Sequence, residues 1–359
     1  MKKSLLLIAS LALCCSSAFA RQYKEACDLT LVGKLFPDTP NPYHRVDTVV
    51  YKGFTKGENK QVRQSSGIAV AFRTNSKFIS VKTNFKYASR GSNTNAFASR
   101  GYDLYIKDNG VWRWAGSGEG KDTNKEITLV KNMASGEKEC LMYLPIYSEE
   151  NSIQVGVADE AFLEPLENPF HHRICVFGSS YTQGSCTSRS GMAWPSQFSR
   201  MTGLQMLNLG CSGNSKLQSY FADCIKCADV DAYVFDAFSN PSAELIEERL
   251  FPFIENIQAA KPGVPLIFLS TIHREKRNFD LKIDKYGKDK MEMAEKMMEE
   301  AVKKYKDVYF VTETATATID GAFYEPTVDG THPDNYGYYL WAKSIVEPVT
   351  KILKNYGIK

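Results

Sequence analysis

The chain has 359 residues, of which 43% are hydrophobic and 24% are charged, and its formal net charge at pH 7 is +3. This composition is typical of a folded globular protein, and the length exceeds what one hydrophobic core usually serves, so two domains are expected. The small net charge gives no strong field for a polyanion and therefore disfavours nucleic-acid binding.

Residues 1–20 have the pattern of a secretory signal: two lysines, an apolar stretch, and the small-residue cleavage site Ala18-Phe19-Ala20. We therefore expect a mature chain that begins at Arg21 and is exported to the periplasm or the cell exterior. Cys14 raises the alternative of a lipid anchor, but Leu13 precedes it where lipoprotein processing favours a small residue. No later apolar run is long enough to span a bilayer.

Seven cysteines follow the leader, an odd number that leaves at least one thiol free or paired outside the chain: Cys27, Cys140, Cys175, Cys186, Cys211, Cys224 and Cys227. Cys224 and Cys227 have the spacing of a metal or redox motif. No second pair accompanies them, so a local disulfide or unreactive helix thiols are expected. Whether Cys186 pairs with Cys211 stays open at this point.

Residues 21–165 alternate between apolar and polar side chains with a period of two, which predicts short β-strands. The expected strands are 48–51, 67–72, 78–83, 102–106, 111–114 and 153–157. The Asn109-Gly110 step predicts a hairpin turn. Because no amphipathic helix is evident, we predict a β-sandwich, an accessory domain similar to a jelly roll.

Prolines at 165 and 169 mark a linker, after which strands and helices alternate through residues 170–359. Strands are expected at 174–177, 206–209, 232–238, 266–271 and 308–311, and helices at 193–201, 217–227, 243–260, 291–305 and 336–354. Alternating strand and helix units predict a parallel sheet that is covered by helices on both faces.

Polar turns follow the expected strands. They are Gly178-Ser179-Ser180, the run from Asn208 to Asn214, the run from Phe238 to Pro241, and the run from Asp329 to Pro333 before the last helix. A serine on a turn usually only closes the turn or caps a helix. In an α/β sheet, however, ligands bind at the carboxyl ends of the strands, so the four turns together indicate a site at one sheet edge.

The turns resemble the sequence blocks of the SGNH, or GDSL-like, hydrolases, a family of serine esterases and acylhydrolases with a flavodoxin-like α/β fold. The matches over residues 172–352 are Gly178-Ser179-Ser180 for the nucleophile turn, Gly213 for a backbone N–H, Asn240 for an amide, and Asp329 and His332 for the Asp-x-x-His pair. Residues 101–105, Gly-Tyr-Asp-Leu-Tyr, resemble the signature of a β-domain that precedes one secreted bacterial branch of these esterases.

The resemblance implies that Ser180 is the nucleophile, His332 the base and Asp329 the acid that orients the imidazole. A serine hydroxyl needs such a base to accept its proton, and neutral imidazole accepts protons near neutral pH. The N–H groups of Ser180 and Gly213 and the amide of Asn240 would stabilise the oxyanion of the transition state.

Two positions depart from the family pattern. Ser179 replaces the usual aspartate, and Phe-Ser-Asn-Pro replaces the usual Gly-x-Asn-Asp of the third block, which leaves Asn214 as a second candidate for the oxyanion amide. His273, with Glu275 nearby, is a rival base. The α/β-hydrolase fold is a rival architecture, but its Gly-x-Ser-x-Gly elbow would need glycine where Thr182 stands.

The sequence therefore predicts a secreted two-domain serine esterase that needs no metal or organic cofactor. An O-acyl group on a glycan, with acetyl first, is the expected substrate, and it rests on family analogy. A lipase, lysophospholipase or thioesterase on the same scaffold is one alternative, and a catalytically silent glycan-binding protein is another. Trp112 and Trp114 are candidates for stacking on sugar rings, but alternate residues of a strand share a face, so the sandwich core is an equal expectation.

Overall fold

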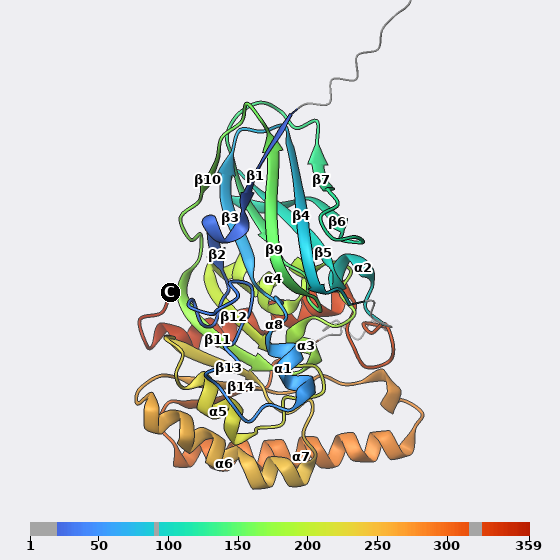
Figure 1. The fold of residues 1–359 in the computed structure, drawn as a ribbon. Helices are drawn as coiled ribbons and strands as arrows, with labels where there is room; N and C mark the ends of the chain where they lie inside the picture. The colour runs from blue at the N-terminus through green and yellow to red at the C-terminus, as the bar shows by residue number, and fades with distance from the viewer. Residues whose placement is uncertain (1–19, 90–92, 316–324) are drawn as a thin grey trace, which may run out of the picture.

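The computed structural model describes residues 20–89, 93–315 and 325–359, so the predicted leader lies outside it except for Ala20. A β-sandwich stands on one side of an α/β domain, and the two are in broad contact (Figure 1). In the described ranges, no helix has the length and apolar character needed to cross a membrane. All seven cysteines beyond the leader are free thiols, including Cys186 and Cys211.

The N-terminal domain consists of two antiparallel sheets, as the period-two pattern predicts. The first has the order β1-β9-β4-β7, formed by β1 (Arg21–Glu25), β9 (Glu149–Ala158), β4 (Phe78–Tyr87) and β7 (Ile127–Lys131). The second has the order β10-β3-β8-β5-β6, with β2 also paired to β3. Its strands are β10 (Leu163–Pro165), β3 (Ala69–Thr74), β8 (Lys138–Tyr143), β5 (Gly101–Asp108), β6 (Val111–Glu119) and β2 (Thr30–Val32).

The C-terminal domain contains a five-stranded parallel sheet in the order β12-β11-β13-β14-β15, which is the strand order of the flavodoxin-like fold. The strands are β11 (His171–Gly178), β12 (Leu204–Gly210), β13 (Ala232–Asp236), β14 (Leu266–Leu269) and β15 (Val308–Val311). The sequence prediction of this architecture is confirmed.

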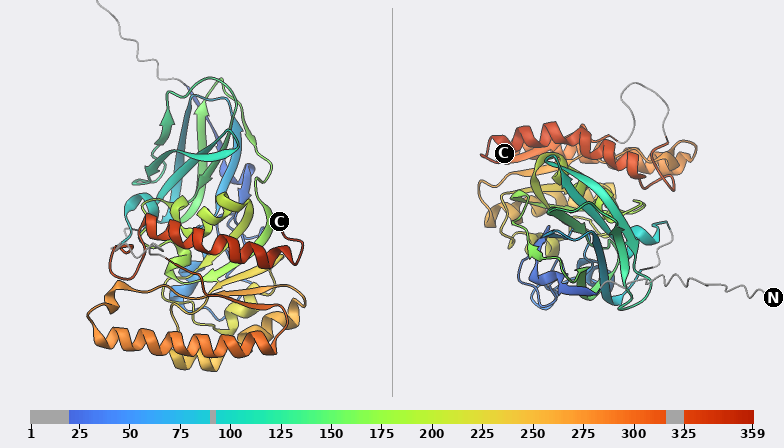
Figure 2. Two further views of the ribbon diagram at one scale, coloured as in Figure 1. Left: turned by 180° about the vertical axis from the view of Figure 1, so that it is seen from behind. Right: turned by 90° about the horizontal axis from the view of Figure 1, so that it is seen from above.

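Helices cover both faces of the parallel sheet (Figure 2). One face packs against α4 (Trp194–Thr202) and α8 (Asn335–Lys354), and the other against α5 (Ser219–Ile225), α6 (Ala243–Ala260) and α7 (Leu281–Lys304). Because the strands are buried on both sides, their central residues are mainly apolar. The layers leave only the ends of the strands free to carry a site.

The two domains share a buried interface. The segment between β2 and β3 leaves the sandwich, and its residues Leu35, Val46 and Val62 join the core of the α/β domain. The guanidinium of Arg45, which is fully buried, donates to the carbonyl oxygens of Asn208 and Gly210 at 3.1 and 3.0 Å. The N-terminal part of the chain therefore supports the loop that follows β12.

The Gly-x-Asp-Leu-Tyr signature lies in β5 at this interface. A Cβ atom on Gly101 would stand 2.5 Å from the carbonyl oxygen of Phe97, so only glycine fits there. The buried carboxylate of Asp103 accepts hydrogen bonds from Arg189 Nε at 3.1 Å and from the N–H of Gly191 at 3.0 Å. The signature thus joins the sandwich to the segment that leads into α4.

Some of the predicted elements are wrong. Residues 48–51 form a turn instead of a strand, because the side chain of Asp47 accepts from the N–H groups of Val49 and Val50. A short helix, α1 (Lys56–Val62), begins there with a capping box between Thr55 and Glu58, a signal present in the sequence. Helix α7 begins ten residues earlier than expected, since Asp280 caps it.

Candidate active site

Ser180 is the first residue of α3 (Ser180–Gln183) and lies two residues after the end of β11. The turn is tight: a Cβ atom on Gly178 would lie 2.1 Å from Thr182 Oγ1 and 2.8 Å from Asp236 Cβ. A glycine is therefore required, and the chain turns from strand to helix within two residues. Ser180 is 8% exposed, so its hydroxyl lies at the surface of a mostly buried turn.

The predicted base and acid lie in line with Ser180. Ser180 Oγ is 2.9 Å from His332 Nε2, and His332 Nδ1 is 2.9 Å from Asp329 Oδ2. The side chains of His332 and Asp329 are 19% and 28% exposed. The structure therefore brings together all three residues of the predicted triad, with the hydrogen-bond geometry that transfer of a proton from serine to imidazole requires.

The loop that carries Asp329 and His332 is held from outside the triad. Glu275 accepts hydrogen bonds from the N–H and the hydroxyl of Thr327, and the N–H of Lys276 donates to the carbonyl oxygen of Gly330 at 2.9 Å. Glu275 is thus engaged by this loop, whereas His273 Nε2 lies 3.0 Å from Asn278 Oδ1. The rival base has no place in the serine–histidine pair.

Asn93, a residue of the β-sandwich, also reaches the acid. Its Nδ2 donates to Asp329 Oδ2 at 3.0 Å and lies 3.5 Å from His332 Nδ1. Desolvation acts to raise the pKa of Asp329, but hydrogen bonds from Asn93 and from the N–H and ring of His332 outweigh it and hold the pKa well below its usual range. Asp329 is therefore an anion at neutral pH.

The candidate oxyanion donors differ in the hydrogen bonds that they already make. In the described part of the chain, neither the N–H of Ser180 nor that of Gly213 donates to another residue, so both are available to a ligand. Asn240 Oδ1 accepts from the N–H of Ser215 at 3.3 Å, which leaves its Nδ2 to donate elsewhere. The Nδ2 of Asn214, in contrast, already donates to Gln61 Oε1 at 2.8 Å and to Ser212 O at 3.2 Å. The geometry favours Asn240 over Asn214.

A buried carboxylate lies under the nucleophile turn where the family usually has aspartate in the turn itself. Asp236 Oδ2 accepts from the N–H and hydroxyl of Ser179 at 2.9 and 2.6 Å and from Thr182 Oγ1 at 3.1 Å. Burial raises the pKa of Asp236, and these hydrogen bonds oppose the rise. Sequence reasoning missed Asp236, although a charged residue at the end of an apolar strand was a usable signal.

The remaining predicted positions lie outside the triad. Trp114 is 53% exposed and donates to Asp103, and Trp112 packs against the outer face of the six-stranded sheet, so neither is in the sandwich core.

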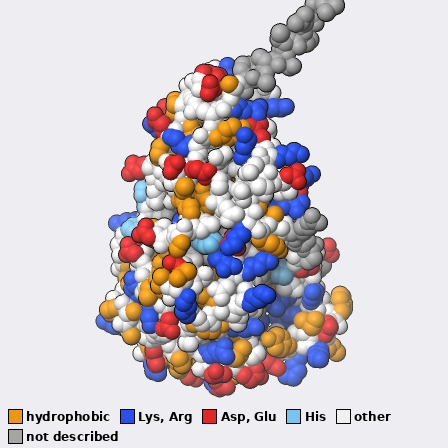
Figure 3. Space-filling view, in the orientation of Figure 1, with side chains coloured by type: hydrophobic (Ala, Val, Ile, Leu, Met, Phe, Trp, Pro, Cys, Tyr) orange, Lys and Arg blue, Asp and Glu red, His pale blue; other side chains and the backbone are white. Residues whose placement is uncertain are grey.

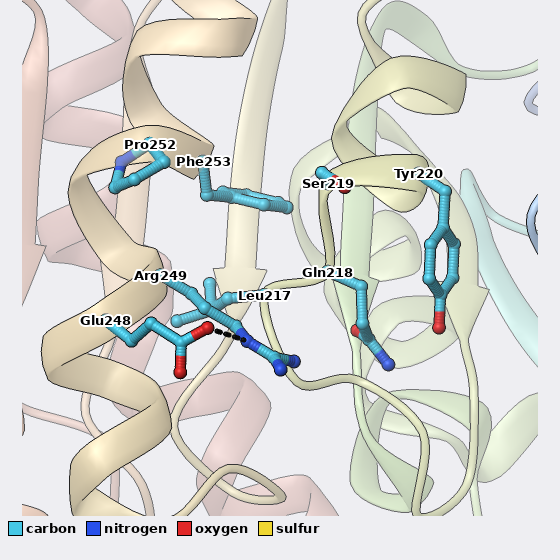
Figure 4. A pocket seen from close by; sticks show the side chains of 8 residues that line it. All are labelled: Leu217, Gln218, Ser219, Tyr220, Glu248, Arg249, Pro252 and Phe253. Carbon is cyan, nitrogen blue, oxygen red and sulfur yellow. Dashed lines mark hydrogen bonds and ion pairs between the residues drawn. The ribbon is translucent and has the colours of Figure 1, made fainter.

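A separate pocket of 440 Å³ lies between the start of α5 and the middle of α6 (Figure 4). Its lining includes Gln218, Tyr220 and Arg249 and none of the predicted site residues. Acidic and basic side chains are interspersed over the face shown in Figure 3.

Two family models match the chain. The GDSL-like lipase/acylhydrolase family matches residues 171–351, and the N-terminus of the SGNH-hydrolase-type esterases, named for its Gly-x-Asp-Leu-Tyr signature, matches residues 21–163. These matches confirm the resemblance seen in the sequence. No curated protein matches the chain.

Solved structures resemble the chain over nearly its full length. A protein from Bacteroides ovatus described as GDSL-like lipase is 37% identical, with a TM-score of 0.88, over 93% of this chain and 98% of that chain. A salicylyl-acyltransferase from a tetracycline biosynthetic pathway is 19% identical, with a TM-score of 0.67, over 92% and 97%. A family two carbohydrate esterase from Cellvibrio japonicus is 11% identical, with a TM-score of 0.61, over 93% and 98%. The last two show the fold alone.

Proposed function

The chain belongs to the GDSL-like lipase/acylhydrolase family and is a hydrolase of ester bonds; from this premise we propose that it is an exported serine esterase that removes O-acyl groups, acetyl first, from carbohydrate. The observation that carries the chemistry is the continuous hydrogen-bonded line from Ser180 Oγ through His332 to Asp329, with both contacts at 2.9 Å. Export rests on the leader pattern in residues 1–20.

In the first half of the reaction, Ser180 Oγ attacks the ester carbonyl while its proton passes to His332 Nε2. Asp329 keeps the other ring nitrogen protonated and stabilises the imidazolium that forms. The tetrahedral intermediate collapses when the bond to the leaving alcohol breaks and His332 returns the proton to that oxygen. The product is an acyl-enzyme on Ser180, which a water molecule cleaves by the same steps.

The negative charge of the tetrahedral intermediate falls on the former carbonyl oxygen. We assign its stabilisation to the N–H groups of Ser180 and Gly213 and to Nδ2 of Asn240. Each such donor typically contributes about 10²–10³ in rate, because it acts on charge that exists only in the transition state. The structure supports this assignment through the availability of all three donors and the commitment of the Asn214 amide to Gln61.

The carbohydrate substrate is supported by the similar fold of the carbohydrate esterase from Cellvibrio japonicus and by the predicted export. A panel of acetylated sugars and of esters with long acyl chains tests it. We expect a higher kcat/KM for the acetylated sugars. A strong preference for long acyl chains would instead support a lipase or lysophospholipase, and a preference for thioesters would support a thioesterase.

Covalent labelling with a fluorophosphonate tests the mechanism. Intact mass should show one adduct on the wild-type protein and none on Ser180→Ala. Ser179→Ala is the matched control, and it should still form the adduct because its neighbour supplies the attacking oxygen. A wild-type protein that forms no adduct would favour a silent glycan-binding protein, and an adduct that survives Ser180→Ala would exclude this serine as the nucleophile.

A further inference from the structure

A cysteine lies beside the proposed triad. The Sγ atom of Cys186, a carboxylate oxygen of Asp329 and a ring nitrogen of His332 all lie within 4.8 Å of one another. Cys186 is 7% exposed and has no disulfide partner. The thiol is thus an unassigned group among the reacting residues.

The backbone fixes this thiol in place. Cys186 has a φ of 67°, a left-handed conformation that is uncommon for residues other than glycine and asparagine. Its N–H donates to Thr94 Oγ1 of the sandwich at 3.0 Å, and the preceding Ser185 N–H donates to Ser180 O at 3.0 Å. The backbone at Cys186 is therefore held by two neighbouring segments.

The three side chains are a ligand set for zinc. A thiolate, an imidazole nitrogen and a carboxylate oxygen bind Zn²⁺ at about 2.0–2.3 Å, and three protein ligands plus water complete a tetrahedral site. Such a site places its ligand atoms about 3.5 Å apart, so side-chain shifts of about 1 Å would be sufficient here. Mg²⁺ and Ca²⁺ require six or more oxygen ligands, which this cluster lacks.

We propose that Cys186, Asp329 and His332 form an inhibitory Zn²⁺ site that overlaps the triad, an inference that rests on the proposed function of Ser180 and His332. Both ring nitrogens of His332 are already used, Nε2 by Ser180 and Nδ1 by Asp329. Whichever nitrogen binds the metal must give up a triad hydrogen bond. Zinc binding and ester hydrolysis therefore exclude each other, and the thiol proton is released to solvent when the metal binds.

Modification of the thiol is a weaker explanation of its position. Burial raises the pKa of the Cys186 thiol to about 12, and Asp329 adds to the rise, so little thiolate is present to react with an alkylating agent or an oxidant. A bound metal changes this balance, because the metal itself stabilises the thiolate.

Zinc titration of ester hydrolysis tests the proposal, with the activity of each variant normalised to its own value without metal. Wild type should lose activity with Zn²⁺ and recover it with EDTA, and Mg²⁺ should have no effect. Cys186→Ala and Cys186→Ser should each need about tenfold more Zn²⁺ for half inhibition, because neither offers a sulfur ligand. Cys227→Ala, which removes an exposed thiol elsewhere, should behave as wild type.

Calorimetric titration with Zn²⁺ separates this proposal from the proposed function. Wild type should bind one Zn²⁺ per chain tightly, and Cys186→Ala and His332→Ala should each weaken that binding about tenfold or more, even if no ester is hydrolysed. Equal zinc sensitivity of wild type and both Cys186 variants would overturn the proposal, as would unchanged binding in His332→Ala.

Discussion

Asn93 extends from the sandwich to the acid of the proposed triad. It lies 236 positions from Asp329 in sequence, yet its amide donates to the same carboxylate oxygen that accepts from His332. Asp329 Oδ1 is held separately by the N–H groups of Thr331 and His332 at 3.0 and 2.8 Å. The acid is therefore fixed at both oxygens, and Asn93 is a positioning residue that acts through it.

Asn93→Ala should reduce kcat and leave KM nearly unchanged. The hydrogen bond involves a charged acceptor but is exposed to solvent, so its loss is worth about 1 kcal/mol, or about fivefold in rate. Asn93→Asp should reduce kcat further, because a second carboxylate would face Asp329. Steady-state kinetics on an acetyl ester measure both effects.

Asn75→Ala is the control for Asn93. This exposed asparagine lies in the β3–β4 turn, at the end of the sandwich away from the α/β domain, and its side chain accepts a hydrogen bond from the N–H of Phe162. It should leave kcat unchanged. Equal losses in both variants would indicate general destabilisation of the sandwich instead of a role at Asp329.

For individual residues, sequence reasoning succeeds where the reacting groups share a loop or follow a strand. Asp329 and His332 are three residues apart, and Ser180 lies two residues after the end of β11, so spacing alone brings each to the correct edge. Asn93 and Cys186 were missed as site residues because their positions depend on contacts between distant segments. Ser179 stands where the family usually has aspartate. The structure explains this replacement, because Asp236 supplies a carboxylate beneath the turn.

Helix α7 contributes a buried lysine that contacts the turn after β13, residues 238–241. Lys290 is 3% exposed, and its Nζ donates to the carbonyl oxygen of Ser239 at 3.1 Å. Arg274 donates to the same oxygen. Two basic side chains thus hold the peptide group that precedes Asn240, the proposed oxyanion amide.

Burial lowers the pKa of Lys290 to about 7, and the neighbouring Arg274 adds to the decrease while Asp236 opposes it. As the pH falls, Lys290 takes up a proton near pH 10.5 in the unfolded chain but only near pH 7 in the folded chain. Stability is therefore lost as the pH falls from about 10.5 to about 7, and at neutral pH the lysine is a cost to the fold.

Lys290→Met should separate activity from stability. We expect kcat to fall about tenfold with little change in KM, since a loosened donor weakens only the transition state. The free energy of unfolding at pH 7 should stay the same or rise, because the buried charge is gone. Enzyme kinetics and thermal unfolding of the same sample check the two expectations.

Lys296→Met on the exposed side of α7 serves as the matched variant, and both measurements should remain at the wild-type level. A parallel loss of stability and activity in Lys290→Met would show that the lysine only supports the fold.

The first turns of α7 escaped sequence prediction for a physical reason. Leu281 is 84% exposed, so the segment lacks the apolar stripe on which recognition of a helix depends.

The molecule as a whole is joined by the segment between β2 and β3. Ser66 Oγ donates to Gln183 O at 2.6 Å, and Gln183 Nε2 donates to Gln64 Oε1 at 2.7 Å, so this segment contacts α3 just behind Ser180. Both domain architectures follow from the periodicity of the sequence. The contact between the two domains does not follow from the periodicity, because polar contacts between a loop and a helix leave no periodic pattern in the sequence.

Glu150 is buried at the sandwich end of this connection. Its Oε2 lies 2.8 Å from Ser65 Oγ, and its Oε1 has no partner among the described residues. Ser65 Oγ also lies 3.0 Å from Pro145 O, which can only accept, so the single hydroxyl proton is required there. A protonated Glu150 then donates to Ser65 Oγ. Desolvation raises the pKa of Glu150 to about 8, in agreement with this arrangement.

The raised pKa makes stability depend on pH. Between about 4.5 and about 8 the folded chain keeps a proton on Glu150 that the unfolded chain has released, so the free energy of unfolding falls as the pH rises through this window. Glu150→Gln stays neutral throughout and should match wild type near pH 5. Near pH 9 it should be more stable than wild type by on the order of 4 kcal/mol. Urea unfolding of both proteins at each pH gives this difference directly. Other titrating groups, such as His44, contribute equally to the stability of both proteins, so their contributions cancel in the difference. A difference that does not change with pH would mean that Glu150 is ionised in the folded chain, and its unpaired oxygen would then need another explanation.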